Sequence, residues 1–415
     1  MTTNTEESRH DESLATALPV ANFLSYFAIA AVEFSVPFVA VSTLGANSLV
    51  IAALGVCRFA PQVLLARSAA HVVERYDLRT VMLGSELLRV AAFVLSALAL
   101  AVSSGIGLAI FAAANVALAC ASILTSVATQ VLVPAVFADE KLPRIYARLG
   151  IAESTADAAA PFLTGLGLAA IGVSQTFGVA AALALGACGL LLRVPRLHAV
   201  SSDTVSGRTA AVPPSTLRRG LSLNLRTPPL RIITVWAVSY NFGQCVIEAL
   251  LLIALLDRTP IAAASYGVIR TCAVLFAAVG AWAAERLPSL LRSGLGTSVF
   301  GCGAVASYAL LGVGVYVGGM KGLVIVLVGF VLDEFCSGVV LVRIQAFRAR
   351  AIAEEDRPIA TAAYRAVNLT AVPAGFAAGG VAGVVLGPAS TVLVVGLLMI
   401  LPAVLILSRS VRETT

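Results

Sequence analysis

The chain has 415 residues, of which 59% are hydrophobic and only 12% are charged. Soluble domains carry about 25% charged residues, so this composition excludes an ordinary water-soluble protein. The formal net charge is +6, but the basic residues lie at the ends of apolar segments. They therefore indicate an orientation in a membrane rather than nucleic-acid binding.

Apolar segments of about 20 residues recur along the chain, and each is long enough to cross a hydrocarbon layer about 30 Å thick. They lack the alternation of a β-strand, so we expect an all-α integral membrane protein. We predict twelve transmembrane helices with these approximate boundaries: 17–41, 46–68, 81–103, 106–131, 150–172, 175–195, 231–256, 262–284, 294–316, 322–345, 360–385 and 388–408.

The loops between these spans differ in charge. Arginines follow every second span, whereas the opposite loops hold only Arg258 and Lys321. Basic loops face the cytoplasm, so both termini are expected there. The predicted domains are a cytoplasmic tail at 1–16, a six-helix bundle at 17–195, a cytoplasmic linker loop at 196–230, a six-helix bundle at 231–408 and a tail at 409–415.

The two predicted bundles repeat each other at an offset of about 211–215 residues. Arg58 in span 2 recurs as Arg270 in span 8, and Glu33 in span 1 recurs as Glu248 in span 7. The repeat indicates a duplication in which both copies have the same orientation. Such parallel repeats, related by an axis along the membrane normal, are known from transporters.

The loop after span 2 reads AHVVERYDLR, from Ala70 to Arg79. It resembles the G-x-x-x-D-[RK]-x-x-x-R signature of the major facilitator superfamily, with Ala70 in place of the glycine and Glu74 in place of the aspartate. The resemblance implies two pseudo-symmetric six-helix bundles that alternate access to a central site.

Three further segments resemble the drug-exporter branch of that superfamily, which includes macrolide and siderophore exporters. They are Pro134–Arg148, the sequence LRRGLSLNLRTPPLR before span 7, and QAFRARAIAEEDRP after span 10. Of the glycine-rich export motif, span 5 keeps only Pro161 and Gly165, so the expectation of export depends on the three segments. The resemblance therefore implies export.

Charged residues inside spans cost about 2.5–3.5 kcal/mol each on insertion scales, so each needs an explanation. They are Glu33, Arg58, Glu153, Asp157, Glu248, Arg270, Asp333, Glu334 and Arg365. In the family fold, spans 3, 6, 9 and 12 lie outside the cavity. In agreement, spans 6, 9 and 12 carry no interior charge, and span 3 has only Glu86 and Arg89 near its predicted cytoplasmic end.

Arg58, Arg270 and Asp333 are expected near the membrane midplane. A guanidinium group stays protonated when buried and presents a planar set of donors that suits a carboxylate or a phosphate. We therefore predict a substrate site formed by Arg58, Arg270, Asp333, Gln244 and Asn241. The alternative is that the arginines pair with Glu33, Glu248 or Asp333 and only lock the helices together.

Glu33, Asp157 and Glu248 are the candidates for proton coupling. A carboxyl group in a low-dielectric environment can load and release a proton near neutral pH. The alternative for each is a permanent ion pair with an arginine. Cytoplasmic gating contacts are predicted for Glu74, Arg75, Arg79, Glu285 and Arg286. The alternative is that these residues are solvated in loops and only set the orientation of the chain in the membrane.

These features predict a secondary active transporter in the cell membrane, acting as a proton-coupled exporter of a small organic molecule with an anionic group. The alternatives are a proton-independent anion exchanger or importer and, more remotely, a membrane receptor. No catalytic spacing, nucleotide-binding loop or Cys/His metal spacing occurs. We therefore expect no enzyme, cofactor or metal site, and a monomer whose partners are substrate, protons and lipid.

Overall fold

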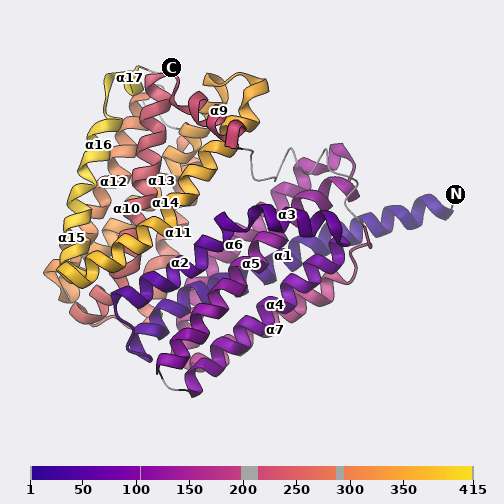
Figure 1. Cartoon of the computed structure of the whole chain (residues 1–415), viewed down its shortest axis with the longest axis horizontal. Helices are drawn as coiled ribbons and strands as arrows, with labels where there is room; N and C mark the ends of the chain where they lie inside the picture. Colours follow the sequence, from indigo (N-terminus) through magenta and orange to yellow (C-terminus); the bar gives the residue numbers. More distant parts are fainter. Residues whose placement is uncertain (1, 103, 198–213, 287–293, 414–415) are drawn as a thin grey trace. The chain divides into compact units, whose positions relative to one another are not determined.

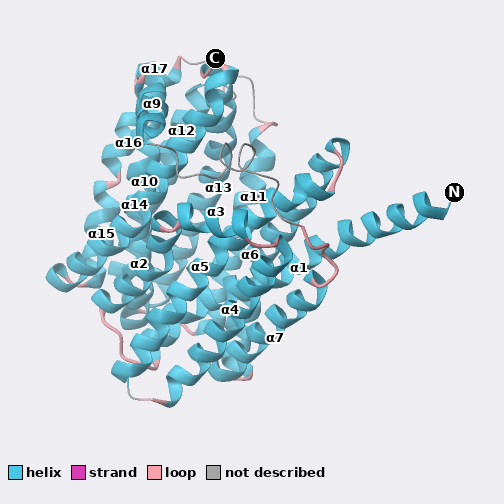
Figure 2. Cartoon of the chain, turned by 45° about the vertical axis from the view of Figure 1, so that its right-hand side comes forward, coloured by secondary structure: helices cyan, strands magenta, loops and turns pink. Residues whose placement is uncertain are grey.

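The computed structural model describes residues 2–102, 104–197, 214–286 and 294–413. Within these ranges every regular element is a helix and none is a strand, as Figure 2 shows. Ten of the helices are long and apolar enough to cross a membrane. The predicted all-α class is confirmed, and the chain is a multi-pass membrane protein.

Two of the twelve predicted spans are not among these ten helices, and the first of them is an eleventh span if a bent pair of helices is counted as one. Predicted span 2, at 46–68, is broken: α2 (Ser48–Leu64) is followed by α3 (Ala66–Arg75) after a bend of 56°. From Ala66 on, the sequence is apolar on one face only, where Ala69 and Val73 are buried. A helix with one polar face does not continue through hydrocarbon, so it turns.

Predicted span 5 corresponds to α6 (Leu142–Ala170). It is 29 residues long but is not among the ten apolar helices of the described chain. Its polar residues include Glu153 and Asp157, which lower its hydropathy. Twelve spans therefore remain a prediction, as does the cytoplasmic location of the termini.

The chain divides into two compact units. Unit 1 comprises residues 1–45 and 57–211, and unit 2 comprises residues 46–56 and 212–415. The start of α2 belongs to unit 2 because Ser48 and Ala52 pack closely on Gly383 and Gly380. The sequence assigned this stretch to the N-terminal bundle instead.

Two segments that were predicted to be a tail and a linker contain helix. The backbone of 2–16 was expected to be a tail, but α1 extends from Thr2 to Ser42, and no proline or glycine precedes Pro19 to interrupt it. Part of the predicted linker, 198–213, lies outside the described residues. The rest of the linker contains α9 (Pro214–Leu225) and the start of α10 (Pro228–Arg258).

Unit 1 holds α1, the second half of α2, and α3. It continues with α4 (Leu78–Leu98), η1 (Ala99–Ala101), α5 (Ser104–Val136), η2 (Asp139–Lys141), α6 and α7 (Val173–Leu191). Helix α1 packs against α6 and α7, and α4 packs against α5 and α7 (Figure 1). The apolar core lies between these helices and includes Leu18, Val73, Met82, Leu132 and Leu191.

Unit 2 holds α9 and α10, then α11 (Ala263–Ala284), α12 (Gly294–Val317), α13 (Gly319–Ala351), η4 (Glu354–Asp356) and α14 (Arg357–Leu386). The chain ends with α15 (Pro388–Leu398), α16 (Ile400–Ile406) and α17 (Arg409–Arg412). Helix α13 packs against α11 and α12, and α10 packs against α14.

Glycines allow these helices to approach closely. A Cβ atom at Gly338 of α13 would overlap the backbone carbonyl of Ala277 on α11, and one at Gly396 of α15 would overlap the carbonyl of Tyr308 on α12. Small residues at such contacts let membrane helices gain van der Waals packing, because lipid supplies little hydrophobic driving force between them.

Candidate functional site

Arg58 and Glu33 form an ion pair that joins α2 to α1 within unit 1. Only 6% of Arg58 is exposed, whereas 42% of the Glu33 side chain is. Nε and Nη1 of Arg58 are buried and have no hydrogen-bond partner among the described residues. The pairing proposed as the structural alternative is thus present for Arg58, but it uses only part of the donor capacity of the guanidinium group.

More carboxylates from α6 lie on the same side of α1. Asn22 donates a hydrogen bond of 3.0 Å to Glu153. Tyr26 interacts electrostatically with Glu153, Asp157 and Arg58, so these groups share one region of unit 1. Asp157 itself is exposed.

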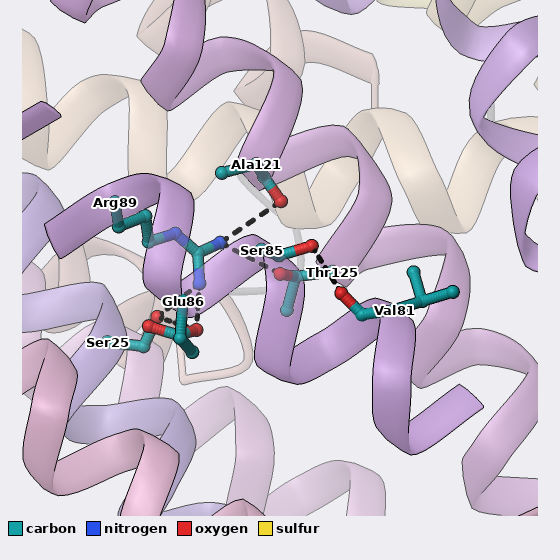
Figure 3. Close-up of polar contacts among 7 residues, drawn as sticks. All are labelled: Ser25, Val81, Ser85, Glu86, Arg89, Ala121 and Thr125. Carbon is teal, nitrogen blue, oxygen red and sulfur yellow. Dashed lines mark hydrogen bonds and ion pairs between the residues drawn. The ribbon is translucent and has the colours of Figure 1, made fainter. Parts of the chain in front are cut away.

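A second ion pair, between Glu86 and Arg89 of α4, lies deep in unit 1 (Figure 3). The two residues are 1% and 2% exposed. Ser25 of α1 donates to Glu86 at 2.8 Å and accepts from Arg89 at 2.6 Å. Arg89 also donates to Thr125 of α5 at 3.0 Å. These contacts tie three helices together around paired charges, which satisfies groups that would be costly to bury alone.

The sequence prediction placed Glu86 and Arg89 outside the cavity and assigned them no role. The signal that could have found the network is their spacing of three, which puts opposite charges on one helix face. The pairing with Ser25 could not be seen in the sequence, because it depends on which faces of α1 and α4 meet.

A small cavity of about 10 Å³ lies beside this network, with polar lining from Asn22, Ser25, Glu86, Thr125 and Thr129. One oxygen of Glu86, Oε2, is buried without a partner among the described residues. This volume is about that needed for one water molecule. The cavity therefore suits an ordered water rather than a transported molecule.

In unit 2, Asp333 of α13 is held by two tyrosines. Tyr240 of α10 donates to it at 2.9 Å and Tyr308 of α12 at 3.1 Å. Asp333 is 4% exposed. Trp236 stacks on Tyr240 with ring centroids 5.2 Å apart. The surroundings of Asp333 therefore satisfy its carboxylate from within the protein.

Arg270 of α11, the repeat partner of Arg58, has different contacts. Its guanidinium group lies 5.0 Å from the centre of the Phe330 ring. Within the described ranges, no carboxylate forms an ion pair with it. Glu248, Glu334 and Asp333 nevertheless act on it electrostatically. An arginine near several acids but bonded to none of them is suited to receive a ligand.

The other predicted substrate residues lie on α10. Asn241 donates to Asn368 of α14 at 2.9 Å and to the carbonyl of Ala237 at 2.8 Å. Gln244 is half-buried one turn further along. Glu248 is exposed. Arg270, Asp333 and Glu248 therefore lie in one electrostatic cluster, while Asn241 is engaged with α14.

The predicted gating residues lie at helix ends. Arg75 ends α3, Arg79 lies in the first turn of α4, and Glu285 caps α11. Arg286 stacks over Trp282 at 4.2 Å. Glu74 is half-buried. A gating role for these five residues stays a prediction.

A polar cluster that the sequence prediction missed attaches α9 to the rest of unit 2. Arg348 of α13 is 8% exposed, lies 3.7 Å from the centre of the Tyr364 ring and donates to Asn224 at 3.1 Å. Asn224 donates to the carbonyl of Ala360 at 2.7 Å. Arg219 pairs with Asp356 at 2.9 Å. Two segments singled out by their resemblance to exporters thus bind each other.

Among the described residues, no group of three or more His, Cys, Asp or Glu side chains is arranged to hold a metal ion. Comparison with family models gives no match. Comparison with curated proteins gives no match either.

Many solved structures resemble the chain. The nucleoside transporter NupG gives a TM-score of 0.69 at 12% identity, over 95% of this chain and 98% of that one. A bacterial homologue of the iron transporter ferroportin, in its inward-facing state, gives 0.70 at 17% identity, over 95% and 99%. The human organic anion transporter MFSD10 gives 0.59 at 15% identity, over 95% and 99%.

These likenesses show the fold: the chain has the fold of these transporters. The superfamily that the motif at Ala70–Arg79 suggests stays a prediction. At such low identity they do not carry a substrate from one protein to another. The resemblance to the drug-exporter branch therefore stays a prediction.

Proposed function

We propose that the protein is a proton-coupled secondary active transporter of a small organic molecule that has an anionic group. The fold supports transport by alternating access, because parallel repeats with a site between them are the basis of that mechanism. The observation that carries the proton coupling is the ion pair between buried Arg58 and exposed Glu33.

Glu33 is the proton carrier in this proposal. Its side chain is 42% exposed, so a proton can reach it, whereas Arg58 is buried beneath it. Protonation neutralises Glu33 and removes most of its attraction to Arg58. The contact between α1 and α2 would then weaken, which links proton binding to a rearrangement of these helices. Asp157 and Glu248 are the other candidate carriers.

Arg270 is the proposed anchor for the anionic group. It forms no ion pair with a carboxylate of the described chain, and its guanidinium group lies against the buried Phe330 ring. A planar guanidinium group can donate two parallel hydrogen bonds to a carboxylate or phosphate. Gln244 is proposed to contact the substrate as well, whereas Asp333 and Asn241 are held by hydrogen bonds within the protein and are proposed to shape the site.

Export is the proposed direction, since the segments before α10 and after α13 resemble those of drug exporters. The cytoplasmic end of the transport path is proposed to be closed by five residues: Glu74, Arg75, Arg79, Glu285 and Arg286. Uptake, or exchange of anions without protons, is the competing proposal.

Proton movement can test the function without a known substrate. The full chain is reconstituted into vesicles with an acidic interior, and acridine orange reports the gradient while a library of antibiotics and metabolites is screened. We expect some compounds to dissipate the gradient in the wild type and in Glu140→Gln, an exposed control, but not in Glu33→Gln. Counterflow of the same compounds should persist in Glu33→Gln.

Two outcomes contradict the proposal. If collapsing the gradient leaves transport of the active compounds unchanged, the coupling to protons is wrong. If Arg270→Ala folds and transports as the wild type does, Arg270 is not the anchor.

A further inference from the structure

The small cavity in unit 1 has a lining in which every polar side chain carries an oxygen atom. Asn22 and Ser25 of α1, Glu86 of α4, and Thr125 and Thr129 of α5 supply these oxygens. The rest of the lining is apolar, and none of the lining residues is basic. Oxygen atoms are the ligands that hard cations prefer, so the lining suits such an ion.

Glu86 keeps one carboxylate oxygen unused. Its Oε1 accepts a hydrogen bond from Ser25 and pairs with Arg89 (Figure 3). Its Oε2 is buried and has no partner among the described residues, and only 1% of Glu86 is exposed. A buried polar atom without a partner costs free energy, so a ligand at Oε2 would stabilise the protein.

The side-chain amide of Asn22 is oriented by Glu153 of α6. Its Nδ2 donates a hydrogen bond of 3.0 Å to Glu153. The amide nitrogen is only a donor and the amide oxygen only an acceptor, so this contact leaves Oδ1 of Asn22 to accept from or bind other groups. Oδ1 of Asn22, Oε2 of Glu86 and the hydroxyl oxygen of Thr129 are therefore three possible ligands at one cavity.

The charged groups at this cavity do not balance. Glu86 and Arg89 cancel each other, but Glu153 forms no ion pair within the described ranges. Arg148 is the nearest base to it on α6, and it donates to a backbone carbonyl of α1 at 3.2 Å. Asp157, four residues after Glu153, is another acid. The region therefore has a net negative charge, which is costly inside a membrane.

Two buried arginines in the described part of unit 1 would oppose a cation, and both are already engaged. Arg89 does not line the cavity, and its terminal nitrogens donate to side chains of α1, α4 and α5. Arg58 pairs with Glu33. Oε2 of Glu86 can therefore bind a positive group without displacing an existing contact.

The size of the cavity selects the kind of ion. Its volume of about 10 Å³ is enough for a single water molecule, and a dehydrated Na⁺ or Li⁺ ion is no larger. Ca²⁺ takes about six to eight oxygen ligands, and Mg²⁺ keeps several of its waters. One unused carboxylate oxygen in so small a space therefore favours a monovalent ion. A water molecule would satisfy Oε2 but would leave the net negative charge, which a cation removes.

We propose that this cavity binds one small monovalent cation such as Na⁺, with Glu86, Asn22 and Thr129 as ligands and Glu153 as the outer partner that orients Asn22. The ion connects α1, α4 and α5 directly, and it connects α6 through Asn22 and Glu153. It stabilises unit 1. The proposed transport function requires no ion other than the proton, so this site is separate from it.

The full-length wild type in detergent provides the first test. Its thermal unfolding is compared in NaCl, LiCl and choline chloride at equal ionic strength. We expect the unfolding temperature to rise with Na⁺ or Li⁺ until the site is saturated, but not with choline, which is too large for the cavity. Binding of radioactive Na⁺ should saturate at one ion per chain.

Two variants locate the ion without breaking the pair of Glu86 and Arg89. Glu153→Gln and Thr129→Val should each weaken Na⁺ binding about tenfold or more, the range for losing a ligand's outer partner or the ligand itself. The matched controls are Glu140→Gln and Thr155→Val, which replace exposed residues outside the cavity and should leave Na⁺ binding unchanged.

The outcomes decide between an ion and a water molecule. If choline chloride stabilises the wild type as well as NaCl does and radioactive Na⁺ does not bind, the cavity holds water only and the proposal is wrong. If Na⁺ binds equally well to the wild type, Glu153→Gln and Thr129→Val, the ion lies elsewhere and the proposal is also wrong. Should either variant fail to fold, the comparison of salts on the wild type still decides.

Discussion

Tyr240 of α10 donates a hydrogen bond of 2.9 Å to Asp333 of α13, and Tyr308 of α12 donates a second one of 3.1 Å to the other carboxylate oxygen. Three helices of unit 2 therefore meet at a single buried acid. The two tyrosine rings lie 5.7 Å apart, so they also pack on each other. The arrangement satisfies a charge that the hydrocarbon would otherwise penalise.

Removing the hydroxyl group of either tyrosine should lower the stability of the protein. We expect Tyr240→Phe and Tyr308→Phe each to lower the free energy of unfolding by about 1.5–3 kcal/mol, the range for hydrogen bonds to charged groups. The effects should not add in the double variant, because both tyrosines serve one carboxylate. Thermal unfolding in detergent, followed by a thiol-reactive dye at the free cysteines, measures this.

Tyr76→Phe is the control, because Tyr76 is 51% exposed. Equal stability of Tyr308→Phe and the wild type would show that Tyr308 does not stabilise Asp333.

The ion pair of Glu86 and Arg89 should tolerate joint removal better than single removal. Glu86→Gln leaves Arg89 charged and buried, so we expect a loss of about 3–5 kcal/mol in the free energy of unfolding. Replacing both residues, by Glu86→Leu with Arg89→Met, should cost much less because no charge remains. The same thermal assay compares the three proteins, and a double variant less stable than Glu86→Gln would contradict the expectation.

Close helix packing predicts that one glycine cannot accept a methyl group. Gly338→Ala would place a Cβ against the backbone carbonyl of Ala277, so we expect a loss of about 1–3 kcal/mol from overpacking between α11 and α13. Gly150→Ala is the matched control in α6, where no atom lies within 4 Å of the added Cβ. There, alanine should stabilise the helix by about 0.5–1 kcal/mol. If Gly338→Ala melts at the same temperature as Gly150→Ala, the helices do not pack tightly at Gly338 and Ala277.

The attachment of α9 can be tested by proteolysis. Asn224→Ala removes the acceptor of Arg348 and the donor to Ala360, so we expect α9 to detach more often and trypsin to cut faster at exposed Arg218 and Arg219. The expected loss is about 1–3 kcal/mol.

Ser222→Ala is the control for this experiment, since the Ser222 hydroxyl donates to the carbonyl of Arg219 within α9 itself. Equal cleavage rates in the wild type and Asn224→Ala would mean that Asn224 does not hold α9.

Several features could be predicted without tertiary structure. The apolar segments and the helical class followed from composition and periodicity, and the fold followed from the motif at Ala70–Arg79. The pairing of Arg58 with Glu33 was one of two alternatives, since the sequence could show that both charges lie in spans but not whether they meet.

Other features could not be predicted. The attachment of the helix within the linker and the network of Ser25 with Glu86 both depend on contacts between distant parts of the chain. Ser25 and Glu86 are 61 residues apart, and Arg348 and Asn224 are 124 apart. Neither pair produces a local pattern.

The sequence by itself determined that this chain consists of apolar helices long enough to span a membrane. Insertion depends on hydropathy summed over about 20 consecutive residues, which can be read locally. Only the tertiary structure decided that Arg58 is covered by Glu33 while Arg270 is bonded to no carboxylate of the described chain, although the two arginines are repeat partners. A charge's partner depends on how helices rotate and pack, and identical motifs can therefore acquire different chemistry.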